Sequence, residues 1–159
     1  MARRVLCGLI SLVLLVSPGL SFASDELLAR VPAAANAVAV VNVEGLFNSK
    51  LGVKQSWGRR YYTDYANGLV AFPPTVQTAV LAAKIDADTI SAEWELGLVR
   101  LKQPFAMKKL AEKEVAALEK LEGHSFVASE RRTCFVELRP QTLAVTNHQN
   151  RQDVARWLR

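Results

Sequence analysis

Cysteine is scarce in this sequence, with two residues among 159. Cys7 lies in an apolar run near the N-terminus, so a chain that loses this run keeps Cys134 alone and cannot form an internal disulfide. The residues around Cys134, from Thr133 to Val136, predict a strand. We therefore interpret this thiol as a small buried apolar group rather than as a nucleophile.

Histidine is equally scarce, and this argues against metal sites and against a base for catalysis. His124 and His148 lack the H-x-x-x-H and H-E-x-x-H spacings of zinc sites. Glu93 and Glu95 share one face of a predicted strand, but calcium needs six or more oxygens and no loop is rich in Asp and Asn. With no G-x-S-x-G motif either, we predict no metal, no cofactor and no catalytic residue.

The glycines are too sparse for a phosphate-binding loop. The stretch "ANAVAVVNVEGLFNSKLG" predicts a strand over 37–43 and a turn, which is how many nucleotide sites begin. The next two glycines are Gly45 and Gly52, at neither the G-x-G-x-x-G nor the G-x-x-x-x-G-K-[ST] spacing, and Glu44 would repel phosphate. The stretch instead predicts a central strand, covered on both faces because it is apolar everywhere except at Asn42.

The N-terminus has the pattern of an export signal. Arg3 and Arg4 precede an apolar run over 5–16, and small residues at Ser21 and Ala23 suit leader cleavage after Ala23. The run is shorter than the roughly 20 residues of a membrane-spanning helix. We predict a signal peptide over 1–23 and a periplasmic or extracellular location. An uncleaved leader that tethers the protein to a membrane is the alternative.

The charge balance does not indicate a nucleic-acid partner. The leader holds two of the 20 basic residues and none of the 15 acidic ones, which leaves 18 basic against 15 acidic residues. This modest excess favours solubility and a mild attraction to anionic surfaces.

Residues 24–159 predict a single α+β domain with a mostly antiparallel sheet of about five strands and helices packed on one face. The predicted strands are 37–43, 91–101, 124–128, 133–138 and 142–146, and the last three form an antiparallel meander. The predicted helices are 24–30, 51–67, a segment "TVQTAVLAAKI" opened by Pro73-Pro74, 104–122, and a last one capped by Asn150 or Asp153 that continues through Trp157.

Basic and aromatic residues interleave in "WGRRYYTDY" and form the candidate ligand-binding site. Its members are Trp57, Arg59, Arg60, Tyr61 and Tyr65. Such a pattern can bind nucleic acid or the apolar faces of sugars, and the predicted export favours a glycan or another envelope polymer. The alternative is structural: the three aromatics, at four-residue spacing, form the buried stripe of a helix whose arginines are solvated.

Glu114 is a second candidate, because it falls within the apolar stripe of the predicted helix 104–122. A buried carboxylate needs a partner or takes a raised pKa, which would make it a functional candidate. The alternative is a glutamate at the edge of the helix, or one paired with an arginine of a strand such as Arg100.

Three segments carry a resemblance: "LLARVPAAANAVAVVNVEGLFNSKLG", "ISAEWELGLVRL" and "GHSFVASERRTCFVELRPQTLAVTNHQNRQDVARWL". Together they resemble the N-terminal part of uncharacterised exported bacterial proteins, notably of planctomycete type, with a "VPxxANAVxVxNVxxLxxSxLG" opening after a leader. The resemblance carries no catalytic residues over. It implies a longer parent protein, and we therefore interpret this chain as a shortened version of one.

The sequence as a whole favours an exported, non-enzymatic domain that binds or has a structural role in the cell envelope or outside the cell. Its partner would be an envelope polymer or another envelope protein. The alternative is the N-terminal part of an envelope hydrolase or transferase whose catalytic residues lie in a missing C-terminal part.

Overall fold

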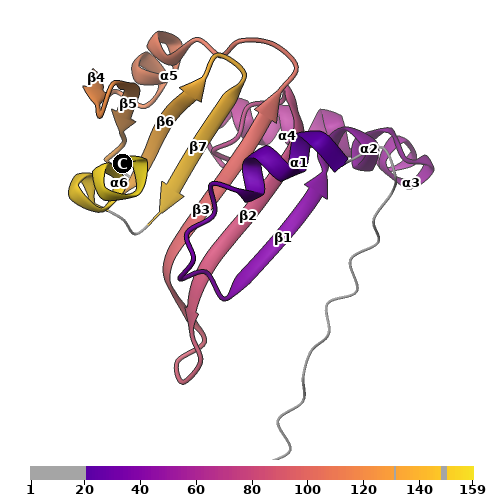
Figure 1. Cartoon of the computed structure of the whole chain (residues 1–159). Coiled ribbons are helices and arrows are strands. Elements are labelled where there is room, and N and C mark those ends of the chain that lie inside the picture. The colour runs from indigo at the N-terminus through magenta and orange to yellow at the C-terminus, as the bar shows by residue number, and fades with distance from the viewer. Residues whose placement is uncertain (1–20, 131, 148–149) are drawn as a thin grey trace, which may run out of the picture.

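The computed structural model describes residues 21–130, 132–147 and 150–159, and one antiparallel seven-stranded sheet forms its centre (Figure 1). The strands lie in the order β1-β2-β3-β7-β6-β5-β4, and every neighbouring pair is antiparallel. Their bounds are β1 Ala37–Asn42, β2 Val76–Asp86, β3 Ser91–Leu101, β4 Leu118–Leu121, β5 His124–Ala128, β6 Thr133–Arg139 and β7 Thr142–Asn147. The α+β class is confirmed, but the expected count of about five strands is wrong.

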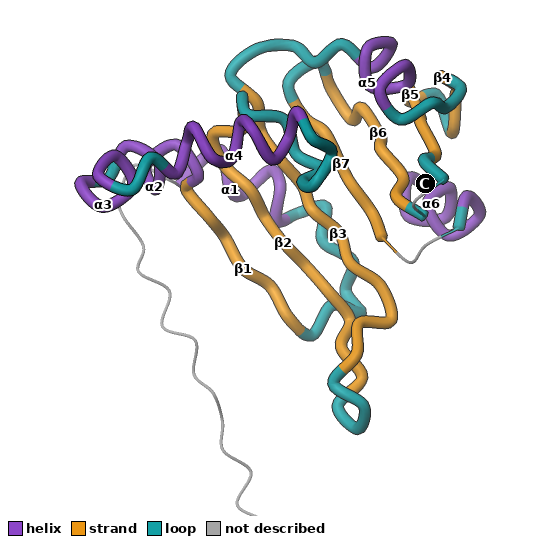
Figure 2. The backbone as a smooth tube through the Cα atoms, turned by 180° about the vertical axis from the view of Figure 1, so that it is seen from behind, coloured by secondary structure: helices purple, strands orange, loops and turns teal. Residues whose placement is uncertain are grey.

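Helices cover both faces of the sheet, which corrects the expected packing on one face (Figures 1 and 2). The helices are α1 Ser21–Leu28, α2 Val43–Asn48, α3 Lys50–Lys54, α4 Trp57–Ala66, α5 Met107–Lys113 and α6 Arg151–Leu158. Leu27 of α1 and Val154 of α6 pack into the core on one face. Met107 and Leu110 of α5 pack into the core on the other.

The two cores exist because the central strands are apolar on both sides. Along β6, Cys134 and Val136 pack into the core beneath α1 and α6, whereas Phe135 packs into the core beneath α5. Successive side chains of a strand point to opposite faces, so a run without polar residues must be covered twice.

The meander β5-β6-β7 is confirmed at nearly the predicted bounds. The preceding segment was predicted as helix to Glu122, and this is wrong. Helix α5 ends at Lys113, Val115 adopts a left-handed backbone with φ of 52°, and β4 then pairs with β5. Glu122 and Gly123, with φ of 48° and 84°, form the two-residue turn of this hairpin, a conformation that glycine adopts without strain.

Strand β2 was predicted as a helix, and this is also wrong. The spacing of Val76, Val80 and Ala83 suits one side of a helix, but the segment pairs with β3 along the length of the strand and with β1 over residues 78–83. Val80 and Ala79 are buried on opposite faces. A short run that is apolar on both sides is compatible with either structure until its neighbours are known.

Strand β1 is confirmed as a strand but is not central. It forms one edge of the sheet, and its residues are half-buried or exposed rather than covered on both faces. The predicted helix over 51–67 is interrupted at Ser56, where φ is 54°, so that α3 and α4 are separate helices.

Both ends of the described chain dock against the sheet. Glu26 of α1 accepts hydrogen bonds from Arg100 of β3 and from Arg139 of β6. Helix α6 begins after its predicted cap Asn150, and the Trp157 Nε1–H donates to the carbonyl of Arg30, in the segment that follows α1, at 2.9 Å.

The predicted leader lies mostly outside the described residues, since these begin at Ser21 in the first turn of α1. Within the described ranges, no helix has the length and apolar character needed to cross a membrane.

Candidate functional site

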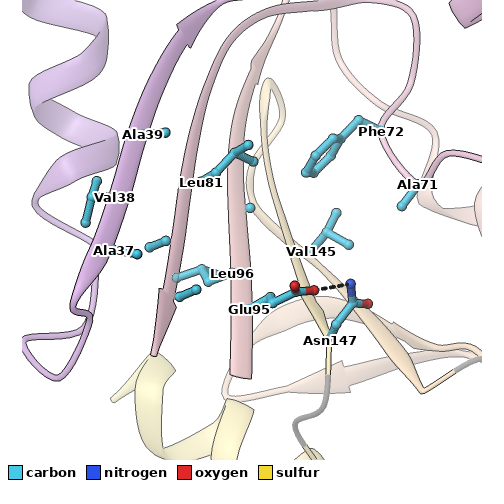
Figure 3. A pocket seen from close by; sticks show the side chains of 13 residues that line it. Ala37, Val38, Ala39, Ala71, Phe72, Leu81, Glu95, Leu96, Val145 and Asn147 are labelled. Atoms are coloured by element: carbon cyan, nitrogen blue, oxygen red, sulfur yellow. Dashed lines mark hydrogen bonds between the residues drawn. The ribbon is translucent and has the colours of Figure 1, made fainter. Parts of the chain in front are cut away.

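An open groove of about 500 Å³ lies on the sheet face opposite to α1 (Figure 3). Its floor consists of side chains from β1, β2, β3 and β7, and the loop that precedes β2 lies over one end. This volume is within the range of about 300–1,000 Å³ that is typical of small-molecule and cofactor sites. It makes the groove the first candidate for a binding site among the described residues.

Two cross-strand rows of side chains build the floor. One row is Ala37, Ala83, Glu95 and Asn147, and the other is Ala39, Leu81, Gly97 and Val145. Directly opposed residues in antiparallel strands share a face and lie about 5 Å apart. The floor is hollow because alanine and glycine occupy its positions on β1 and several of those on β2 and β3, where larger side chains would fill the space.

Phe72 covers one end of the groove. Its ring lies over Gly97, and a Cβ atom added to Gly97 would come within 2.2 Å of the ring Cζ. Glycine in a strand often marks such a close approach. The hydroxyl of Tyr61 in α4 donates to the Phe72 carbonyl at 3.1 Å, and burial raises the pKa of Tyr61 to about 12, so the phenol keeps the proton it donates. Tyr61 therefore positions the cover of the groove.

The other end of the groove is polar. The Asn147 side-chain amide donates to Glu95 Oε2 at 3.1 Å (Figure 3). Thr133 in turn donates to Asn147 Oδ1 at 2.9 Å. Glu95 is exposed at the mouth, and among the described residues that line the groove it is the one with an ionisable side chain. A long apolar surface that ends in one oriented carboxylate suits the binding of a mostly apolar ligand.

The aromatic residues of the predicted site on α4 each contact a different part of the structure. Trp57 donates to the Gln55 side chain at 2.8 Å, Tyr61 holds Phe72, and Lys113 of α5 lies 3.4 Å from the centre of the Tyr65 ring. The three aromatics are half-buried, whereas the structural alternative expects a buried stripe. Arg59 and Arg60 are exposed on the same helix. A ligand-binding role for these five residues stays a prediction.

Glu44, which follows β1, has a structural contact. It accepts from Lys102 at 2.7 Å and from Gln77 at 3.3 Å, and these hydrogen bonds, that of Lys102 first, lower the pKa of its carboxyl. The backbone N–H of Gly45 donates to the Asn42 side chain at 2.7 Å, which caps α2. The turn after β1 is therefore stabilised by side-chain hydrogen bonds of Asn42 and Glu44.

Glu114 is the C-cap residue that follows α5, and it accepts a hydrogen bond from Ser129 at 2.8 Å. Arg100, the partner considered for it, is bound to Glu26 instead. Glu93 pairs with Lys84 at 2.7 Å. Among the residues that the structure describes, no three His, Cys, Asp or Glu side chains gather as a metal site requires.

Cys134 is buried, with 6% of its surface exposed, which confirms the structural interpretation of its position. Burial raises the pKa of the thiol, and a hydrogen bond with Thr146 opposes this in part. A protonated, enclosed thiol is a poor nucleophile.

The groove was not among the sites predicted from the sequence. The available signals were the alternation of alanines at 37 and 39 and the isolated Gly97 within a strand. These residues indicate a groove only when the strand register is known, because the register places them in adjacent rows on one face.

Comparisons of this chain with protein families, with curated proteins and with solved structures find no match. The resemblance to exported proteins of planctomycete type therefore stays a prediction.

Proposed function

We propose that this chain is a non-enzymatic binding domain that works outside the cytoplasm, and that the groove on the β1 side of the sheet is its ligand site. The observation that carries this proposal is an open, largely aliphatic cavity of about 500 Å³ with a hollow floor. Burial of apolar ligand surface there supplies about 25 cal/mol per Å² before the costs of association.

The lining favours binding over chemistry. Apart from Glu95, the described side chains of the groove are aliphatic, aromatic or amide, and these residues include no pair of nucleophile and base. Glu95 is oriented by Asn147 and would contact a polar or cationic end of the ligand.

Nile red, a neutral apolar dye, tests the site on the full chain. The variant Ala83→Leu fills the floor between Ala37 and Glu95 and should weaken dye binding at least tenfold. Ala128→Leu makes the same change on an exposed strand position in β5 and should bind the dye as the unaltered chain does. Absence of dye binding, or equal binding by all three proteins, would reject the groove as a ligand site. Circular dichroism verifies that both variants are folded.

The proposed export rests on the N-terminal pattern of Arg3, Arg4, the apolar run and the small residues at 21 and 23. N-terminal sequencing of protein from a bacterial envelope fraction should give Ser24 as the first residue. An intact Met1 or Ala2 would overturn leader cleavage and favour the tethered alternative.

A further inference from the structure

Strand β1 presents an unprotected edge. It is the outermost strand next to β2, and no strand in the described chain pairs with its outer side (Figures 1 and 2). Its sequence, AVAVVN, contains no charged residue and no proline. Native edge strands are usually blunted by charge, proline, shortness or a covering element, because unpaired backbone groups recruit another strand.

The opposite edge of the same sheet is protected in these ways. Strand β4 has four residues, and Glu119 and Lys120 make it charged. Arg151 of α6 binds the Glu119 carboxylate and also donates to the Lys120 carbonyl at 3.4 Å. Within the described part of the chain, pairing is therefore blocked at the β4 edge, and the β1 edge is open.

The open edge is also held in place. The Asn36 side chain, immediately before β1, donates to the Ile85 carbonyl and accepts from the Ile85 N–H, both at 2.8 Å. At the far end, Asn42 caps α2. A strand fixed at both ends loses little further entropy when a partner pairs with it.

The groove is continuous with this edge, because Ala37 and Ala39 of β1 lie in its floor. A strand added outside β1 would lie about 4.8 Å away and would turn every second side chain toward the groove. The side chain beside Ala37 would pass over two alanines, Ala37 and Ala83, whereas the one beside Ala39 would meet Leu81.

We propose that the ligand of the groove is an extended polypeptide segment of another protein, which adds to β1 as an eighth strand and places two apolar side chains, two residues apart, in the groove. This inference rests on the proposed binding function. Backbone hydrogen bonds along β1 supply affinity, and the groove selects a large apolar side chain beside Ala37 and a smaller one beside Ala39.

A second copy of this chain suits the groove less well. In a symmetric antiparallel pair of β1 strands, the partner strand turns its own Ala37, Ala39 and Val41 to the same face. Two of these three side chains are methyl groups, so the groove would stay mostly empty. An unfilled apolar groove forgoes the burial that stabilises such a contact.

The test uses a short synthetic peptide with phenylalanine and leucine two residues apart, threonines around them and a lysine at each end. It should bind the full chain, displace Nile red, and slow amide hydrogen exchange in β1 at least tenfold while exchange in β4 stays unchanged. Hydrogen exchange reports backbone pairing directly.

Two control peptides separate the contribution of the side chains in the groove from that of the backbone hydrogen bonds with β1. One carries alanine in place of phenylalanine and leucine and should bind at least tenfold more weakly, because the groove is left empty. The other keeps the side chains but has N-methylated backbone amides on the pairing side and should also bind at least tenfold more weakly. Equal binding of the N-methylated peptide would overturn strand addition.

The outcomes distinguish this inference from the function it rests on. Dye binding that is sensitive to Ala83→Leu, together with no binding or displacement by the peptide, overturns the inference and leaves the groove as a site for small apolar molecules. No dye binding overturns both. Sedimentation that shows a dimer with protected β1 amides in the absence of peptide would identify a second copy as the occupant and reject the proposal.

Discussion

The ring of Phe72 lies so close to Gly97 that a Cβ atom on residue 97 would come within 2.2 Å of the ring Cζ and 2.8 Å of Cε1. One residue lies in a loop and the other in a central strand, and their contact closes one end of the groove. The same contact therefore contributes to the packing of the fold and shapes one end of the groove.

We expect Gly97→Ala to destabilise the fold by about 1–3 kcal/mol, because the added methyl group overpacks the space under Phe72. In a Phe72→Ala background the same change should cost at least about 1 kcal/mol less, since the ring is gone. Urea unfolding of the four proteins in this double-mutant cycle measures the difference. Additive effects would show that the two residues do not share the space.

Glu44→Gln should remove a pH-dependent part of the stability. Hydrogen bonds from Lys102 and Gln77 lower the pKa of Glu44 below its ordinary value of 4.5, so the stabilisation is complete above that pH and is lost as the pH falls through the folded-state pKa. The free energies of unfolding of Glu44→Gln and the unaltered chain should therefore differ at neutral pH and converge in acid. Urea unfolding over a range of pH measures this.

Glu112→Gln, at an exposed position of α5, is the matched control for that experiment. A difference between Glu44→Gln and the unaltered chain that stays constant with pH would contradict the assigned contact with Lys102.

The buried thiol of Cys134 should react slowly in the native protein. Burial raises its pKa and encloses the sulfur, so reaction with a thiol reagent requires opening of the structure. In a Cys7→Ser background, we expect labelling at least about a hundred times slower in buffer than in denaturing urea. Comparable rates in both conditions would show that the thiol is accessible.

The cap of α6 should contribute measurably to stability. Asn150 Oδ1 accepts from the backbone N–H groups of Gln152 and Asp153 at 2.9 and 3.0 Å, and the helix buries Val154 completely. Asn150→Ala should cost about 1 kcal/mol. Gln152→Ala, an exposed change in the same turn, should stay within about 0.5 kcal/mol of the unaltered chain. Equal losses for the two variants would argue against the cap.

The local patterns predicted the meander well. The segments that became β5, β6 and β7 are short, contain β-branched and aromatic residues, and are separated by turns too short for crossover helices, so antiparallel pairing was the available solution. The last helix was predicted for a similar reason, since a good cap precedes residues with apolar side chains at helical spacing.

The two helices predicted in error fail for different reasons. The alanine-rich segment of β2 satisfies a helical spacing as well as a strand, and its place between β1 and β3 decides in favour of the strand. In the segment after α5, the left-handed Val115 ends the helix, and pairing with β5 stabilises β4 instead. Contacts distant in sequence decide both cases.

Local sequence patterns were sufficient to predict the α+β class, the antiparallel meander, the burial of Cys134 and the helical character of α4. Each of these depends on local spacing, turn residues or composition, which are properties of neighbouring residues along the chain. The edge position of β1, the helices on both faces, and the groove left by Ala37, Ala83 and Gly97 depend instead on how the strands assemble. A cavity depends on what lies across the sheet from each small residue, and strand register sets this, because a shift by one residue would turn the same alanines to the other face.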